Sequence, residues 1–154
     1  IYRTYLTDNL PYDGVLAKEA DGISASIERL IERFVDWQFA RRDENKFLEV
    51  TLRSGRRETL YRSDLISGAI IASIVERAKA IAIKRAIGTQ QEEGIRETDL
   101  QLAFNAEYAE NDIFPATDIT EDWLKLIDYD PENVVKISPV RPVSDAHVRT
   151  TSVI

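Results

Sequence analysis

The side chains that could do chemistry in this sequence are mostly carboxylates, and their spacing forms no catalytic pattern. The chain has no cysteine and a single histidine, His147, which excludes thiol catalysis and cysteine-ligated zinc or iron–sulfur sites. The group Asp128, Asp130 and Glu132 has the residue types of a calcium site. Pro131, however, stands where a calcium-binding loop needs a glycine turn, and no loop of the required length follows. We therefore interpret this segment as a charged linker and expect no metal site.

No short motif for cradling a phosphate or activating a nucleophile occurs: GxxxxGK[ST], GxGxxG and GxSxG are all absent. The remaining carboxylates, such as Glu92 and Glu93, fall on predicted helix faces or in loops, which is typical of solvated surface. A carboxylate pair doing acid–base work is the less favoured alternative. We expect His147 to be exposed in a tail. Trp37 and Trp123 are predicted core residues, because a stacking platform for bases needs a basic groove.

The charge balance argues against two classes of partner. The 154 residues include 27 acidic and 20 basic side chains, a formal net charge of −7. Nucleic acids and anionic membranes bind basic surfaces, so we expect neither partner. No apolar run is long enough to span a bilayer and no basic-then-apolar leader is present, so we expect a cytoplasmic protein without a membrane segment. The first residue is not methionine, and we expect the chain to be a piece of a longer protein.

The elements that hold these residues are predicted mainly from periodicity. Apolar residues recur every three to four positions in several stretches, which indicates amphipathic helices. Pro11 should end the first helix, Ser63 or Asp64 should cap the third before it stops ahead of Gly88, and Thr98 should cap the fourth. The predicted helices cover residues 1–10, 23–42, 64–87, 99–111 and 121–127.

The period changes to two in residues 47–52, where Leu48, Val50 and Leu52 share one face of a predicted strand. Gly55 allows a turn over residues 53–56, and residues 57–62 form the return strand of a β-hairpin. A lone hairpin is marginal in water, so it needs a helix or a third strand, for which residues 134–138 are the candidate. The residues alone thus predict a mixed α+β, mostly helical domain with a hairpin.

Three segments, in their order along the chain, resemble the small helical lid of AAA-type ATPases. Residues 67–71 (Ser-Gly-Ala-Ile-Ile), followed by spaced alanines, look like the start of a lid helix. Residues 1–5, followed by Leu10 and Pro11, are similar to the first lid helix. Residues 97–104, which contain Thr-Asp-Leu-x-x-Ala, resemble the closing lid helix.

A narrower resemblance is to the C-terminal region of the actinobacterial proteasomal ATPases, the family also called ARC or Mpa. It is carried by residues 44–51 (Glu-Asn-Lys-Phe-Leu-Glu-Val-Thr), by residues 75–84 and by residues 108–112 (Tyr-Ala-Glu-Asn-Asp), and it continues at Asp122-Trp123. It covers roughly residues 1–141. A helix and hairpin such as residues 23–62 are absent from most AAA lids, which makes the match specific.

The resemblance implies a domain organisation and a role. Residues 1–22 and 63–112 would form the AAA small subdomain, and residues 23–62 a helix and hairpin insertion. Residues 113–141 would complete a β-grasp-like element, and residues 142–154 would be a flexible tail. The full-length protein would be a homo-hexameric ATPase that unfolds and translocates pupylated proteins. This part would not be catalytic alone; it would close over ATP or ADP and support ring assembly, with Mg held by a large subdomain upstream.

The resemblance also assigns four nucleotide-contacting positions. Ile1 and Tyr5 correspond to lid residues that pack on adenine, and Gly68 and Ala69 to the helix start whose backbone approaches the nucleotide. Physical chemistry agrees, because a helix N-terminus without bulky side chains allows close approach and presents free N–H groups. The alternative for both pairs is structural: core packing of the first helix, and tight packing at a helix start.

The C-terminal residues depart from the family pattern. Members that work with a proteasome core end in Gly-Gln-Tyr-Leu, whereas this sequence ends in residues 151–154, Thr-Ser-Val-Ile. If that is the natural end, we expect no docking to a proteasome core through the tail. A second interpretation of the whole chain is a stand-alone β-grasp-like protein-interaction module that binds partners through its hairpin edge.

Overall fold

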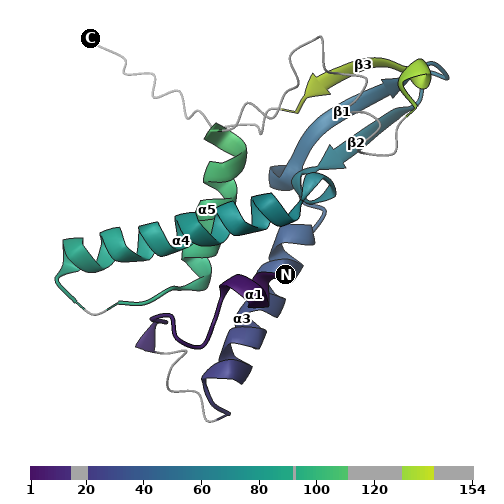
Figure 1. The fold of residues 1–154 in the computed structure, drawn as a ribbon. Coiled ribbons are helices and arrows are strands. Elements are labelled where there is room, and N and C mark those ends of the chain that lie inside the picture. The colour runs from purple at the N-terminus through teal and green to yellow at the C-terminus, as the bar shows by residue number, and fades with distance from the viewer. Residues whose placement is uncertain (15–20, 92, 111–129, 141–154) are drawn as a thin grey trace, which may run out of the picture.

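The computed structural model describes residues 1–14, 21–91, 93–110 and 130–140. A small antiparallel sheet projects from one end of a group of packed helices (Figure 1). The predicted α+β class with a mostly helical body is confirmed. The helices are α1 (Tyr2–Tyr5), α3 (Ile23–Phe39), α4 (Gly68–Thr89) and α5 (Glu97–Glu110); the strands are β1 (Lys46–Leu52), β2 (Arg57–Tyr61) and β3 (Val134–Pro139); and the short 3-10 turns are η1 (Asp43–Asn45), η2 (Arg62–Leu65) and η3 (Pro131–Asn133).

The helical core forms where the apolar stripes of the four helices meet. Phe34 of α3 is fully buried at its centre, with its ring edge-on to Tyr2 at 5.4 Å and to Phe104 at 6.5 Å. Trp37 stacks on Phe34 at 5.9 Å, which confirms the predicted core role of Trp37. Ala78 of α4 is fully buried and lets α4 and α5 pack closely. Helix α3 therefore buries its apolar face in this core as predicted. It ends at Phe39, however, and not at the predicted residue 42.

The sheet has the strand order β2-β1-β3, so the hairpin is completed by a strand that comes much later in the chain. Leu48 and Val50 are buried on one face, as the alternation predicts, and Val50 lies opposite Ile137 of β3. Gly55 has a φ of 82°, a left-handed value that suits glycine in the turn. The predicted hairpin and the predicted third strand are both confirmed.

The first helix is shorter than the predicted residues 1–10. It ends at Tyr5, because Leu6 has φ −92° and ψ 81°, and the Leu6 side chain is fully buried. The Nη1 of Arg3 donates to the Leu6 carbonyl oxygen at 2.7 Å, which satisfies an acceptor that a longer helix would have used. The hydroxyl of Tyr12 then donates to the Thr7 carbonyl oxygen at 2.9 Å and holds the following loop.

The predicted cap of the third helix is also wrong. Ser67 is the cap of α4, and its hydroxyl accepts the Ile70 N–H at 3.3 Å. Asp64 instead accepts the Tyr61 N–H at 2.9 Å and forms a bidentate ion pair with Arg41. Its carboxylate therefore stabilises η2 and does not cap α4.

The ends of α4 and α5 differ from prediction as well. Helix α4 continues through Gly88 to Thr89, and Gln90, with a φ of 54°, ends it. Thr98 lies inside α5, whose first turn is held by Asp99, because the Asp99 carboxylate accepts the Arg96 N–H at 2.9 Å.

Several predictions lie outside the described residues: the short helix 121–127 with Trp123, residues Glu92 and Asp128, His147, and the tail 142–154. The division into subdomains stays a prediction, to which the structure adds that α3 shares one hydrophobic core with α1, α4 and α5. In the part of the chain that is described, no helix is both long and apolar enough to cross a membrane.

Candidate functional site

The N-terminus of α4 is exposed and free of bulky side chains. Gly68 and Ala69 are its first two residues, and both are exposed. A Cβ built on Gly68 would meet no atom within 4 Å, so open space lies in front of this end of the helix. The first turn contains no acidic residue, which leaves its partial positive charge unneutralised. This end of α4 can therefore accept an anionic group.

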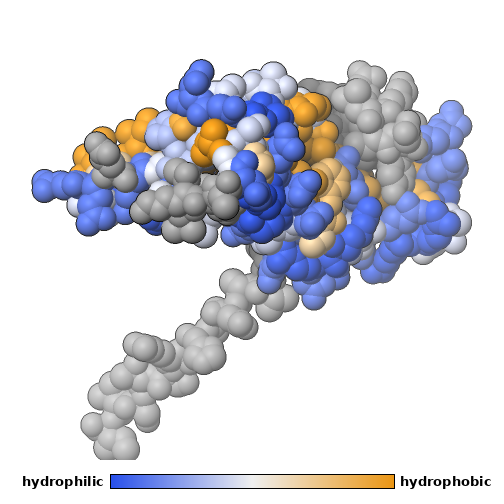
Figure 2. Space-filling view, turned by 90° about the horizontal axis from the view of Figure 1, so that it is seen from below, coloured by the Kyte–Doolittle hydropathy of each residue, from blue (hydrophilic) through white to orange (hydrophobic). Residues whose placement is uncertain are grey.

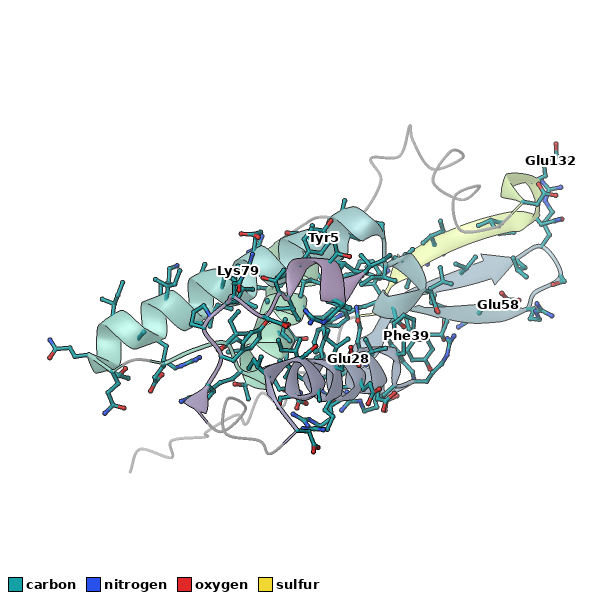
Figure 3. All side chains as sticks on the ribbon, turned by 60° about the horizontal axis from the view of Figure 1, so that its bottom comes forward. Tyr5, Glu28, Phe39, Glu58, Lys79 and Glu132 are labelled. Atoms are coloured by element: carbon teal, nitrogen blue, oxygen red, sulfur yellow. The ribbon has the colours of Figure 1, made fainter. Side chains whose placement is uncertain are left out.

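The short helix α1 lies alongside the N-terminal half of α4 (Figures 1 and 3). Ile1, directly before α1, is 72% exposed, so its side chain is available for contact with another group. Tyr5 is half-buried and packs against the helical core. The buried aromatic of α1 is Tyr2, whose hydroxyl donates to Oε1 of Gln38 at 3.0 Å. Burial raises the pKa of Tyr2 to about 12.

The structure thus places the four predicted residues on two contacting elements. Ile1 and Tyr5 belong to α1 and its cap, and Gly68 and Ala69 to the first turn of α4. An apolar side chain, an aromatic ring and free helix N–H groups match the chemistry of a purine nucleotide, which has a flat base and anionic phosphates. Among the described residues no three carboxylates or imidazoles lie together in a way that could hold a metal ion.

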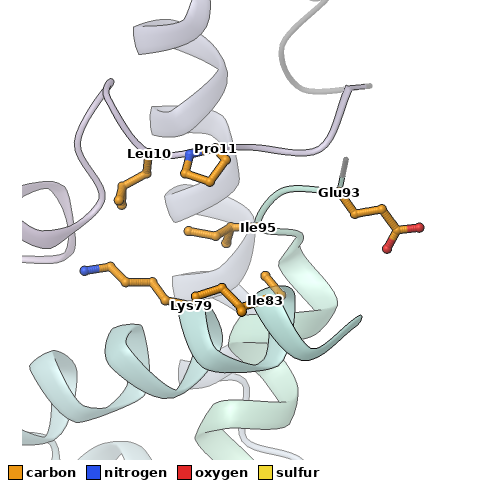
Figure 4. Close-up of a pocket in the computed structure, with 7 residues that line it drawn as sticks. Leu10, Pro11, Lys79, Ile83, Glu93 and Ile95 are labelled. Carbon is orange, nitrogen blue, oxygen red and sulfur yellow. The ribbon is translucent and has the colours of Figure 1, made fainter. Parts of the chain in front are cut away.

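A small apolar pocket lies further along α4 and was not predicted (Figure 4). It has a volume of about 120 Å³ and is lined by residues of the α1–α3 connection, α4 and the segment before α5. Leu10 and Pro11 face Ile83 and Ile95 across it, while the charged ends of Lys79 and Glu93 extend to opposite sides, away from Ile95. Ligand pockets usually enclose several hundred Å³, so this one is too small for a nucleotide.

A network of ion pairs around Arg85 lies next to this pocket, and its member Glu93 also lines the pocket. Arg85 of α4 forms ion pairs with Glu93 and with Asp99, and its Nη2 donates to the Gly94 carbonyl oxygen at 2.6 Å. The hydrogen bond that Arg85 donates to the Asp99 carboxylate raises the pKa of Arg85. Gly94 is required here, because a Cβ on it would lie 2.2 Å from the carbonyl carbon of Tyr12. The sequence gives no signal for this close approach beyond the glycine itself.

Seen from below the bundle, the described residues form no broad apolar face. Figure 2 shows hydrophilic residues over most of that side, with the apolar atoms in separate patches. This face is typical of a solvated surface and does not itself indicate a binding site. The candidate site is therefore argued from the exposed first turn of α4 alone.

Comparison with known proteins gives a consistent result. The sequence profile described as "ARC, AAA+ ATPase lid domain" matches residues 1–153. The chain is 36% identical over 140 residues to an "AAA ATPase forming ring-shaped complexes" from Corynebacterium kroppenstedtii, a match that spans 90% of this chain and 24% of that protein. It is 42% identical over 138 residues to a "Proteasome-associated ATPase" from Saccharopolyspora erythraea, spanning 89% of this chain and 23% of the relative.

A third relative, a "Proteasome-associated ATPase" from Mycobacterium leprae, is 40% identical over 138 residues, which is 89% of this chain and 22% of that protein. The chain therefore spans about a quarter of the length of the curated relatives it matches.

Proposed function

Because this chain belongs to the ARC family of AAA+ ATPase lid domains, we propose that it closes over ATP or ADP held by the core domain of a ring-forming ATPase. The observation that carries the proposal is the exposed first turn of α4. Gly68 and Ala69 present backbone N–H groups there without a competing carboxylate. Ile1 and Tyr5 supply the apolar and aromatic contacts for the base.

Catalytic groups are assigned to the part of the protein outside this chain. The sequence lacks a GxxxxGK[ST] loop, and no metal-binding group occurs among the described residues. We assign phosphate hydrolysis and the Mg ion to the core domain. In this scheme the lid contributes contacts that depend on which nucleotide is bound, and passes that state to the rest of the ring.

The parent protein is proposed to be a homo-hexamer that unfolds and translocates pupylated proteins. The support is the family membership and the names of the relatives, which describe ring-shaped complexes and association with the proteasome. The net charge of −7 disfavours this chain as the surface that recruits an acidic protein tag, so tag recognition is assigned elsewhere in the parent.

A second candidate function rests on the sheet. Strands β2 and β3 are both edge strands, and each leaves one edge without a paired strand among the described residues. Such edges can add a strand from another protein. In this alternative the chain is a β-grasp-like interaction module, and the start of α4 has no ligand.

Nuclear magnetic resonance on the 154-residue chain distinguishes the two functions. Titration with millimolar Mg-ATP should shift the amide signals of Gly68 and Ala69 and the ring signals of Tyr5, and leave the strands unchanged. The affinity should be low, because most phosphate contacts belong to the missing core. Shifts confined to β2 or β3, or no shifts at all, would contradict the lid proposal.

A matched pair of variants controls for folding. Ala69→Asp adds a carboxylate to the first turn, which stabilises the helix but repels phosphate. Ala69→Asn has the same shape without the charge. We expect Ala69→Asp to weaken the nucleotide-induced shifts at least severalfold and Ala69→Asn to retain them. Equal behaviour of the two variants would show that no anion binds there.

A further inference from the structure

The helices and the sheet meet at a small joint built around the last turns of α5. The ring of Phe47 in β1 lies edge-on to Tyr108 of α5, with 5.5 Å between the ring centres. The Tyr108 hydroxyl donates to the carbonyl oxygen of Arg62, directly after β2, at 2.7 Å. One aromatic side chain of the bundle therefore contacts the beginning of β1 and the end of β2.

Arg62 occupies the centre of this joint. Its guanidinium carbon lies 6.0 Å from the centre of the Phe104 ring and 5.8 Å from that of Tyr108. Its Nη1 donates to Oδ1 of Asn105 at 2.8 Å. Its Nε is buried, with no hydrogen-bond partner in the described part of the chain. The ring contacts offset part of the desolvation of this cation, which explains why a half-buried arginine is tolerated.

Arg62 is also close in sequence to the start of α4. It is the first residue of η2, which is followed only by Ile66 and by the cap Ser67. The Ile66 N–H donates to the Ser63 carbonyl oxygen at 3.3 Å, so this connection is itself hydrogen-bonded. Arg41, which follows α3, also holds η2 through its ion pair with Asp64 at 3.1 Å.

We propose that Arg62 is a positioning residue that fixes the first turn of α4 relative to the sheet, so that a displacement of the sheet is transmitted to Gly68 and Ala69. A partner that moves the sheet would then change the end of α4 that faces the nucleotide. The mechanical coupling is inferred from the contacts of Arg62 and Tyr108. Only its consequence for ligand binding rests on the proposed function.

Amide hydrogen exchange at single residues tests the coupling. Arg62→Gln removes the charge and the contact with Asn105, and should speed exchange of the Ile70 and Ile71 amides about tenfold, since both hydrogen-bond to Ser67. Exchange of Ile74, one turn further, should not change. Arg62→Lys, which keeps the charge, should give an intermediate effect and serves if Arg62→Gln does not fold. Arg57→Gln, on the exposed hairpin, is the matched control and should have no effect.

A double-mutant cycle then separates transmission from local loosening. Leu48→Ala, which loosens the sheet, should speed exchange of Ile70 and Ile71 when Arg62 is present and add little in the Arg62→Gln background. Additive effects, a uniform rise along α4, or no rise at Ile70 and Ile71 would overturn the proposal. If the exchange results hold while the Ala69 variants behave alike, the coupling stands and the nucleotide function fails.

Discussion

The helical bundle and the sheet differ sharply in how much apolar surface each one buries. Among the described residues, the bundle core contains sixteen buried hydrophobic residues from four helices and the segments that connect them, whereas the cluster of the sheet contains three, Leu48, Val50 and Leu60. At about 1.5–3 kcal/mol for each large buried side chain, the bundle has ample stabilisation and a three-residue cluster does not. The sheet therefore depends on its attachment to the helices, and the joint at Arg62 and Tyr108 is the critical contact.

The strongest test of this comparison is at the centre of the bundle. Phe34→Ala should lower the free energy of unfolding by about 3–5 kcal/mol, because Phe34 is fully buried and contacts three other rings. Urea unfolding measures the loss. Phe39→Ala, on the same helix but 50% exposed, is the control and should cost less than about 1 kcal/mol. Equal losses would show that the core is not centred where the structure places it.

The second test asks whether the sheet opens separately. Leu48→Ala should weaken the sheet by about 2–3 kcal/mol. Exchange of the Val50 and Ile137 amides should accelerate far more than exchange of Phe104 in α5, since the sheet can open while the bundle stays folded. An equal acceleration in both regions would mean that the sheet and the bundle form a single cooperative unit, which would contradict separate opening of the sheet.

The third test concerns the close contact between Gly94, in the segment before α5, and the backbone of Tyr12. Gly94→Ala should cost about 2 kcal/mol, because the added Cβ would lie 2.2 Å from the Tyr12 backbone. Gly88→Ala is the matched control: a Cβ there meets nothing within 4 Å, and alanine should stabilise α4 by about 0.5–1 kcal/mol. Thermal unfolding should therefore move in opposite directions for the two variants.

The smallest expected effect is a dependence on alkaline pH. Burial raises the pKa of Tyr2 to about 12 in the folded chain, above its ordinary value of 10.0. Folding thus favours the neutral phenol, and this contribution to the free energy of unfolding is complete below pH 10. As the pH rises toward 12, up to about 2 kcal/mol of that free energy is lost. Tyr2→Phe should lose less stability over that interval than the unmodified chain. Parallel loss in both would exclude Tyr2 as the titrating group.

The sequence predicts the sheet better than it predicts the ends of the helices. The hairpin follows from local signals, the alternation of residues 47–52 and the turn at Gly55, and both survive in the structure. The length of α1 and the cap of α4 depend on contacts from elsewhere. Arg3 satisfies the Leu6 carbonyl oxygen, and Arg41 holds Asp64 at η2. No periodicity in the sequence reports such contacts.

The candidate site is predicted only in part. The resemblance to AAA lids supplies Gly68 and Ala69 as predicted positions, and the structure adds only that a helix begins there with open space in front of Gly68. Arg62 could not have been identified, because an arginine at the end of a strand normally points into water. Its role depends on Phe104 and Tyr108, which reach it only through the packing of α5.

The position of β1 has a consequence for synthesis on the ribosome. Its partner β2 follows at once, but its other edge is paired only when residues 134–139 have been made. Until then a nascent chain carries Leu48 and Val50 on an open edge, a template for pairing with a neighbouring chain. A message truncated between residues 110 and 134 would leave that edge permanently unpaired, and its product should be prone to aggregation while its helices still fold.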